Sequence, residues 1–153
     1  MIFVSTGTVG FEPLVRLLDD LCMNGRIRHR VVAQIGSIKY EPGGFEYFRF
    51  DAEIRRWIRE ADLVISHGGQ GTIRDVLAER TRLVAVPNPI VADNHQYWFL
   101  RKLESLGQLH LCCGLDADEL LRVTQEALAG PPPESTYDFY PDSFRQAVKR
   151  SLK

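Results

Sequence analysis

The fold of this chain is decided by residues 62–75, DLVISHGGQGTIRD. Within this stretch, the apolar run from Leu63 to Ile65 is typical of a short buried strand. Closely spaced glycines follow it, and then the apolar residues take the spacing of an amphipathic helix. Glycines at such a turn let backbone N–H groups approach a ligand, and the N-terminus of the helix adds partial positive charge. The stretch therefore predicts a binding site for an anion such as a phosphate.

The rest of the chain repeats this alternation of short apolar runs and amphipathic helices. Strands are predicted at residues 2–4, 31–35, 45–50, 63–65, 83–86 and 109–112. The strand at 45–50 alternates with charge, so we expect it near an edge of the sheet. Strands that alternate with helices form right-handed βαβ units. We therefore expect an α/β fold, a Rossmann-like parallel sheet of about six strands with helices on both faces.

The ends of several helices are marked by residues that prefer those positions. Asp51 and Asp116 each precede a run with helical spacing, and we expect both to cap the helix that follows. A helix is predicted from Gln70 to about Glu79, and another from about residue 94 to a stop at Gly107. The apolar stripe of this last helix is expected to be Tyr97, Leu100, Leu103 and Leu106.

Composition narrows the class of protein. The 153 residues are 44% hydrophobic, which predicts one domain with a real core. A net charge of −1 gives no support to electrostatic nucleic-acid binding. No run of 18 apolar residues occurs, and the N-terminus lacks the basic start of a signal peptide. The cysteines number 3, which does not suggest a disulfide framework, so we expect buried thiols in a reducing cytosol.

The chain is expected to divide near residue 130. Residues 1–130 hold the alternating pattern, and residues 131–153 begin with a proline-rich linker and end in a short basic helix. The aromatic residues of this tail are Tyr137, Phe139, Tyr140 and Phe144. The tail either packs back on its own domain or docks on a partner or an acidic membrane surface.

Ligands of an open parallel sheet bind beyond the carboxyl ends of its strands, and polar and glycine residues gather in the loops there. These loops are residues 5–10, 66–72, 87–89 and 92–96. Neither glycine loop matches the dinucleotide or Walker signature, no Gly-x-Ser-x-Gly elbow occurs, and no cluster suggests a metal. A dehydrogenase, a P-loop NTPase and a serine hydrolase are therefore disfavoured.

Individual residues of these loops each allow a functional and a structural interpretation. His67 either binds phosphate or acts as a base, or it is a structural polar residue at the end of a strand. Asp75 lies about one helical turn after Gly71 and either accepts hydrogen bonds from ribose hydroxyls or is a solvated helix acid. His95 and Gln96 either contact sugar hydroxyls or provide ordinary polarity at the start of a helix.

Taken together, three motifs resemble the donor-binding C-terminal domain of glycosyltransferase family 28. They are SHGGQGTIRD at 66–75, VP at 86–87 and DNHQ at 93–96. The opening Gly7-Thr8, followed by Phe11 and Leu14, is similar to the same group. The resemblance covers about residues 1–130. It is strongest to the small cytosolic catalytic subunits of two-component UDP-sugar transferases, which act in dolichol-linked oligosaccharide, capsule or exopolysaccharide synthesis.

The resemblance implies the C-terminal half of a GT-B glycosyltransferase. The residues implied around the pyrophosphate are Gly7, Thr8, Gly68, Gly69, Gly71 and Thr72. Asp75 stands where the family usually has a ribose-binding Glu, and its shorter side chain is a departure. His95 and Gln96 match positions that contact the donor sugar, and Phe50 lies where the uracil-side loop is expected. Gln70, Asn94 and His67 complete the expected donor-binding set.

The implied reaction is an inverting transfer of N-acetylglucosamine, glucuronate or galactose from a UDP-sugar to a lipid-linked saccharide. Backbone amides and a helix N-terminus are expected to stabilise the leaving pyrophosphate without a metal or another cofactor. His67 is the candidate base. Because a GT-B donor site lies between two domains, we expect a membrane-anchored partner subunit at the cytosolic face, and a homo-oligomer is possible in isolation. The alternatives are a nucleotide-sugar-binding module without catalysis and an unrelated Rossmann-like oxidoreductase.

Overall fold

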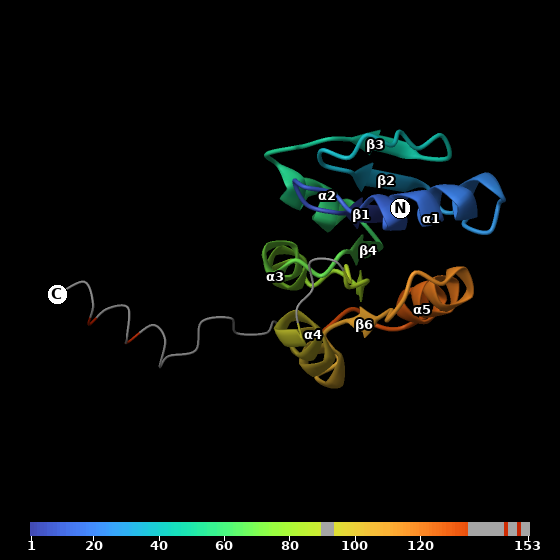
Figure 1. The fold of residues 1–153 in the computed structure, drawn as a ribbon. Helices are drawn as coiled ribbons and strands as arrows, with labels where there is room; N and C mark the ends of the chain where they lie inside the picture. The colour runs from blue at the N-terminus through green and yellow to red at the C-terminus, as the bar shows by residue number, and fades with distance from the viewer. Residues whose placement is uncertain (90–93, 135–145, 147–149, 151–153) are drawn as a thin grey trace.

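The computed structural model describes residues 1–89 and 94–134, together with residues 146 and 150 (Figure 1). Asp93 and the aromatic residues expected in the tail lie outside the described residues. The interpretations of the tail and the division of the chain near residue 130 therefore stay predictions.

A parallel sheet of six strands forms the centre of the molecule. The strands are β1 Ile2–Ser5, β2 Val31–Gln34, β3 Glu46–Phe48, β4 Leu63–Ser66, β5 Leu83–Ala85 and β6 His110–Leu111. Their order across the sheet is β3-β2-β1-β4-β5-β6, and every neighbouring pair is parallel. The predicted fold class is confirmed, and so is the position of β3 at an edge. The order reverses between β1 and β4, where ligands of such sheets bind.

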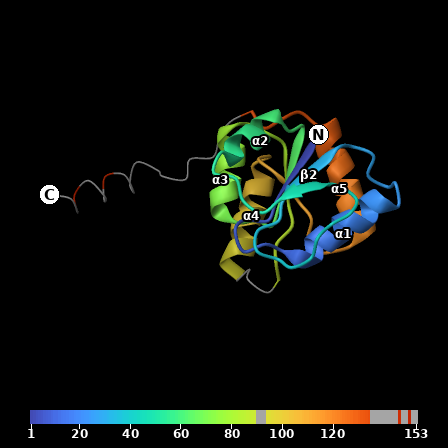
Figure 2. The same ribbon diagram turned by 90° about the horizontal axis from the view of Figure 1, so that it is seen from above.

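Helices cover both faces of the sheet (Figure 2). They are α1 Glu12–Met23, α2 Ile54–Glu60, α3 Gln70–Ala78, α4 Asn94–Ser105 and α5 Ala117–Ala129. Helices α1 and α5 pack on one face, and α2, α3 and α4 pack on the other. Successive residues of β1 serve the two faces, since Ile2 and Val4 join the first core and Phe3 joins the second. Burial on both faces explains why the central strands are continuously apolar.

Of the two predicted caps, one is confirmed and one is wrong. Asp116 caps α5, because its carboxylate accepts a hydrogen bond of 2.8 Å from the N–H of Glu119. Asp51 does not cap α2, whose N-cap residue is Glu53. A turn separates Asp51 from the helix, and its carboxylate instead accepts hydrogen bonds from the Glu53 N–H at 2.8 Å and the Trp57 indole at 2.9 Å. Asp51 thus fixes the turn that leads into the helix.

The predicted stripe of α4 holds at its centre and fails at its ends. Leu100 and Leu103 are fully buried, whereas Tyr97 is exposed and Leu106 is 52% exposed. The helix ends at Ser105, and Gly107 turns the chain with a φ of +68°. Leu106 therefore lies past the helix and no longer shares its buried face.

The cysteines are free thiols, and the prediction that all of them are buried is wrong for Cys113. Strand β6 ends at Leu111, so Cys113 begins the exposed turn that leads to α5. Burial raises the pKa of the Cys22 and Cys112 thiols to about 11. Both are therefore protonated and poorly nucleophilic near neutral pH.

A buried carboxylate on α1 holds the loop that precedes β3. Asp19 accepts hydrogen bonds from the backbone N–H groups of Gly43 at 3.1 Å and Gly44 at 2.6 Å, and from the Tyr40 hydroxyl. We expect Asp19→Ala to lower the free energy of unfolding by about 1–3 kcal/mol, because three hydrogen bonds to one charged acceptor are lost and their donors are partly buried. Urea denaturation measures this. Asp20→Ala, at the exposed neighbouring residue, is the control and should change stability by no more than about 0.5 kcal/mol.

Candidate functional site

Two adjoining cavities open at the carboxyl edge of the sheet, beside the reversal between β1 and β4. The loop cavity has a volume of about 420 Å³ and is lined by Thr6, Gly7, Thr8, Val9, Gly10, His67, Gly69, Gly71, Thr72 and Asn88. The Asp75 cavity has a volume of about 260 Å³ and is lined by Gly7, Thr8, Gln34, Phe50, Asp51, Ala52, Ile54, Ile58, Gly71, Thr72 and Asp75. Their shared wall is Gly7, Thr8, Gly71 and Thr72. An elongated ligand can therefore occupy both.

The parallel pairing of β1 with β4 places the two glycine loops side by side. Ser5 and Ser66, the last residues of these strands, are partners in the register. Both strands end at the same level of the sheet, so the loops that follow them, about 60 residues apart in sequence, form one wall. The carboxyl-end rule for parallel sheets predicted this meeting of loops.

His67 is enclosed between the two glycine loops. Its Nδ1 atom lies 3.3 Å from the carbonyl oxygen of Ser5, which can only accept a hydrogen bond. A Cβ atom at Gly69 would lie 2.7 Å from Nε2, and one at Gly7 would lie 3.1 Å from Cε1. Gly7 also has a φ of +71°, which side chains rarely adopt. The closeness of the imidazole ring therefore favours glycine at position 69, and the positive φ together with the tight contact favours it at position 7.

The electrostatic state of His67 follows from these contacts. Burial lowers the pKa of the imidazole, and the hydrogen bond to Ser5 opposes this shift. The ring is therefore neutral near pH 7, with its proton on Nδ1 and a lone pair on Nε2.

The N-terminus of α3 supplies uncapped backbone donors to the shared wall. Gly69 is its N-cap residue and has no side chain to accept their hydrogen bonds. Gly71 and Thr72 lie in the first turn and line both cavities. A Cβ atom at Gly71 would meet nothing within 4 Å, so the backbone is open to a ligand there. First-turn N–H groups and the helix dipole together suit an anion.

Asp75 is partly exposed and forms an ion pair. Its carboxylate lies on the wall of the Asp75 cavity and forms an ion pair of 3.1 Å with Arg55 of α2. Phe50 lines the same cavity with a 66% exposed side chain. The two residues expected near a nucleoside thus lie in one cavity.

The predicted site residues fall into two groups. The lining residues are Gly7, Thr8, His67, Gly69, Gly71 and Thr72, with Phe50 and Asp75 in the second cavity. Four further residues, Gly68, Gln70, His95 and Gln96, do not line either cavity, and the side chain of Asn94 is outside the described residues. The amide of Gln96 instead donates a hydrogen bond of 2.8 Å to the carbonyl oxygen of Gly68. The roles expected of these residues stay predictions.

Sequence reasoning missed the lining residues Gln34 and Asp51, and it placed Asn88 in an expected ligand loop without naming it as a site residue. Gln34 and Asn88 carried a signal, because each is a buried polar residue at or after the end of an apolar strand. The described residues contain no group of three or more His, Cys, Asp or Glu that could hold a metal ion. Whether the site works without a metal stays a prediction.

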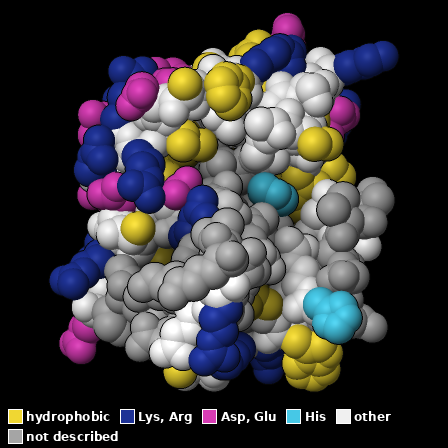
Figure 3. All heavy atoms as spheres, turned by 90° about the vertical axis from the view of Figure 1, so that its left-hand side faces the viewer, with side chains coloured by type: hydrophobic (Ala, Val, Ile, Leu, Met, Phe, Trp, Pro, Cys, Tyr) yellow, Lys and Arg dark blue, Asp and Glu magenta, His cyan; other side chains and the backbone are white. Residues whose placement is uncertain are grey.

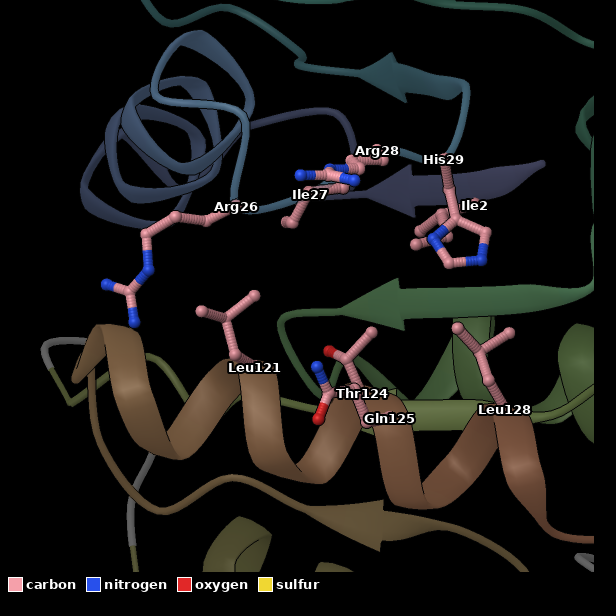
Figure 4. A pocket seen from close by; sticks show the side chains of 9 residues that line it. All are labelled: Ile2, Arg26, Ile27, Arg28, His29, Leu121, Thr124, Gln125 and Leu128. Carbon is pink, nitrogen blue, oxygen red and sulfur yellow. The ribbon is translucent and has the colours of Figure 1, made fainter.

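A smaller cavity of about 190 Å³ lies elsewhere, between α5 and the segment that leads into β2 (Figure 4). Its lining includes Ile2, at the amino end of β1, and side chains of α5 that point toward the sheet. None of the predicted site residues lines it. Figure 3 shows one face of the molecule, where acidic and basic side chains of the described residues lie close together.

Within the described residues, no helix is long and apolar enough to span a membrane.

Solved structures with the same fold include MurG of Acinetobacter baumannii, with a TM-score of 0.69 and 19% identity, covering 97% of this chain and 48% of that one. A solution structure of ALG13 has a TM-score of 0.60 and 22% identity, covering 96% of this chain and 94% of that one. The predicted equivalence to the C-terminal half of a longer glycosyltransferase is confirmed at the level of the fold.

Curated relatives agree with this fold. The UDP-N-acetylglucosamine transferase subunit ALG13 of Homo sapiens is 31% identical over 122 residues, covering 72% of this chain and 11% of the relative. The subunit of that name from Eremothecium gossypii is 40% identical over 91 residues, covering 56% of this chain and 44% of the relative. This chain thus spans less than half the length of both. The family model described as glycosyltransferase family 28 C-terminal domain matches residues 1–128. The chain therefore belongs to the glycosyltransferase family 28 C-terminal domain family.

Proposed function

We propose that this chain is the donor-binding subunit of an inverting glycosyltransferase that uses a UDP-sugar. The observation that carries the proposal is the wall of Gly7, Thr8, Gly71 and Thr72, shared by two cavities. A pyrophosphate at this wall would meet the N-terminus of α3, with a nucleoside on the Asp75 side and a sugar on the His67 side. Membership of the family supports a donor site on this chain.

The chemistry proposed for the site is stabilisation of the departing pyrophosphate. Attack on the anomeric carbon breaks its bond to the β-phosphate oxygen, and negative charge grows on the UDP that leaves. The uncapped first turn of α3 contributes Gly71 and Thr72 to the wall where this charge would develop. Loss of one such preorganised donor typically costs about 3 kcal/mol of transition-state stabilisation. We propose that the shared wall and the N-terminus of α3 stabilise the pyrophosphate without a metal or another cofactor.

His67 is the candidate base on this chain. A base needs a lone pair, and the hydrogen bond from Nδ1 to Ser5 leaves one on Nε2. Donation from Nε2 to a phosphate would require a protonated ring, which burial disfavours. The geometry therefore supports a proton acceptor better than a phosphate ligand. The partner subunit remains the other source of a base.

The names of relatives favour one sugar and one class of acceptor. ALG13 is named as a subunit of a UDP-N-acetylglucosamine transferase. A relative from Acinetobacter baylyi, 27% identical, is named UDP-N-acetylglucosamine–N-acetylmuramyl-(pentapeptide) pyrophosphoryl-undecaprenol N-acetylglucosamine transferase. We propose N-acetylglucosamine ahead of glucuronate or galactose, and a lipid-linked saccharide as acceptor. A membrane-anchored partner would present that acceptor, with this chain at the cytosolic face.

The choice of donor can be tested by thermal unfolding with UDP-N-acetylglucosamine, UDP-glucuronate, UDP-galactose and UDP-glucose. With all four donors at the same concentration, we expect UDP-N-acetylglucosamine to stabilise the protein most, because only the folded state binds it. At 100 times its own Kd this stabilisation is about 2.7 kcal/mol. Co-expression with a membrane partner and a labelled donor then separates a transferase from a module that only binds. Stabilisation by NAD without any effect of UDP would contradict the proposal and favour an oxidoreductase.

The place of the pyrophosphate can be tested with Gly71→Ala. The new methyl group meets no protein atom, and alanine favours a helix, so stability should stay equal or rise by up to about 1 kcal/mol. The affinity for UDP, measured by calorimetry, should nevertheless fall about tenfold, which corresponds to about 1.4 kcal/mol. Gly43→Ala is the matched control, since its methyl group also meets nothing and lies outside both cavities. Equal UDP affinity in both variants would refute this placement.

The state of His67 predicts a dependence of stability on pH. The pKa of its imidazole is lowered by folding, so between about pH 6.5 and the lower folded value the unfolded state binds more protons. The free energy of unfolding should therefore decrease as pH falls below about 6.5. Urea denaturation at pH 7.5 and 5.5 should show a smaller decrease in His67→Asn than in the wild type. His95→Asn, at an exposed position, should behave like the wild type.

A further inference from the structure

We propose that Gln34 is a positioning residue that fixes the two donor cavities relative to each other. The inference rests on the proposed function and deepens it. Gln34 is the last residue of β2, follows three apolar residues, and is only 3% exposed. It lines the Asp75 cavity. A polar side chain at such a buried strand end requires hydrogen-bond partners. Its partners are backbone groups of residues that line the cavities.

The side chain of Gln34 links the loop after β1 to the turn after β3. Its amide nitrogen donates a hydrogen bond of 3.4 Å to the carbonyl oxygen of Gly7. Its amide oxygen accepts a hydrogen bond of 3.3 Å from the backbone N–H of Asp51. Strand β2 lies between β1 and β3 in the sheet. The carboxyl end of β2 therefore lies between the loop that follows β1 and the turn that follows β3. The orientation of the amide follows from its partners, because the Gly7 carbonyl can only accept and the Asp51 N–H can only donate.

The backbone of Gln34 adds a second link to the same loop. Its carbonyl oxygen accepts hydrogen bonds from the backbone N–H of Thr6 at 3.1 Å and from the Thr6 hydroxyl at 3.0 Å. Thr6 and Gly7 are therefore both attached to one residue of β2. This attachment sets where the loop cavity begins.

On the other side, Asp51 is anchored to α2. Its carboxylate accepts hydrogen bonds from the indole of Trp57 at 2.9 Å and from the guanidinium of Arg56 at 2.9 Å. The pKa of this carboxyl is lowered by the hydrogen bonds from the Trp57 indole and the Glu53 N–H, and then by Arg56. Gln34 thus joins the phosphate-side loop to a turn that is itself fixed, and Phe50 belongs to that turn.

The functional consequence concerns a ligand that spans both cavities. Such a ligand gains full affinity only when the two walls keep their spacing, since a loose site must be ordered at the moment of binding. A small misplacement also lowers the rate of reaction. The two hydrogen bonds of the amide are long and therefore weak, so their loss should lower the stability of the fold only slightly. The larger effect is expected on binding, which depends on the spacing of the two walls.

The first test removes the amide while keeping the length of the side chain. Gln34→Met should bind UDP about tenfold more weakly than the wild type in calorimetry, with a folded protein shown by circular dichroism. Gln108→Met is the matched control. Gln108 is also buried, at 7% exposure, but it precedes β6 and lines neither donor cavity. Equal UDP affinity in Gln34→Met and Gln108→Met would overturn the proposal.

The second test restores a hydrogen-bond donor at position 34 by lowering the pH. In Gln34→Glu the new carboxyl keeps an acceptor for Asp51, and it can donate to the Gly7 carbonyl only when protonated. Asp51 and Asp75 line the same cavity and should raise its pKa, opposed by Arg55 beside Asp75. UDP affinity relative to the wild type should therefore improve as pH falls from 8 to about 5.5. If Gln34→Glu at pH 5.5 binds UDP no more tightly than Gln34→Met, which has neither donor nor charge, the donor role of the amide is overturned.

A third measurement separates this proposal from the function on which it rests. Hydrogen exchange of the Asp51 amide needs no ligand, and it should be faster in Gln34→Met than in the wild type, with Gln108→Met unchanged. If the wild type binds no UDP, the proposed function fails, while exchange at Asp51 still reports the link. If exchange at Asp51 is the same in all three proteins, the link itself is refuted.

Discussion

The parallel pairing of β1 with β4 is the constraint on which the rest of the structure depends. These strands leave the sheet at the same edge, and their connections turn in opposite directions from that point. The loops that follow therefore face each other with no element between them. Gly7 in one loop and Gly69 in the other both lie against the imidazole of His67. The position of the cavities and the enclosure of the neutral histidine follow from this one pairing.

Much of the fold was predictable because hydrophobic spacing reports burial directly. The buried strand at 63–65 and the helix after Gly69 have periods that differ clearly, and the structure agrees with both. The errors occur at the ends of helices, where the path of the backbone determines which residue caps the helix and where the helix stops. Asp51 has the chemistry of a cap, yet an intervening turn gives the position to Glu53. Leu106 continues a helical spacing past the point where the helix has ended.

The candidate site was predictable where loops carry glycine, and less so where a strand supplies the residue. Gly7, Gly71 and His67 lie on the cavity walls because loops at one edge of a sheet must meet. Gln34 was missed because an apolar strand hides a single polar residue, and its partners are known only once β1 and β3 are seen on either side of β2. The ion pair of Asp75 with Arg55 depends on how α2 and α3 pack, which no local pattern contains. Because both side chains are partly exposed, that pair is weak and can yield Asp75 to a ligand.

The enclosure of His67 has a consequence for how this site can change during evolution. A methyl group at Gly69 would overlap the ring, and one at Gly7 would touch it. Exchange of Gly69 is therefore opposed by the ring, and exchange of Gly7 by both the ring and its positive φ, while a smaller side chain at position 67 would leave an empty space between the loops. The three positions should be inherited together, as a single character that a lineage keeps or replaces whole.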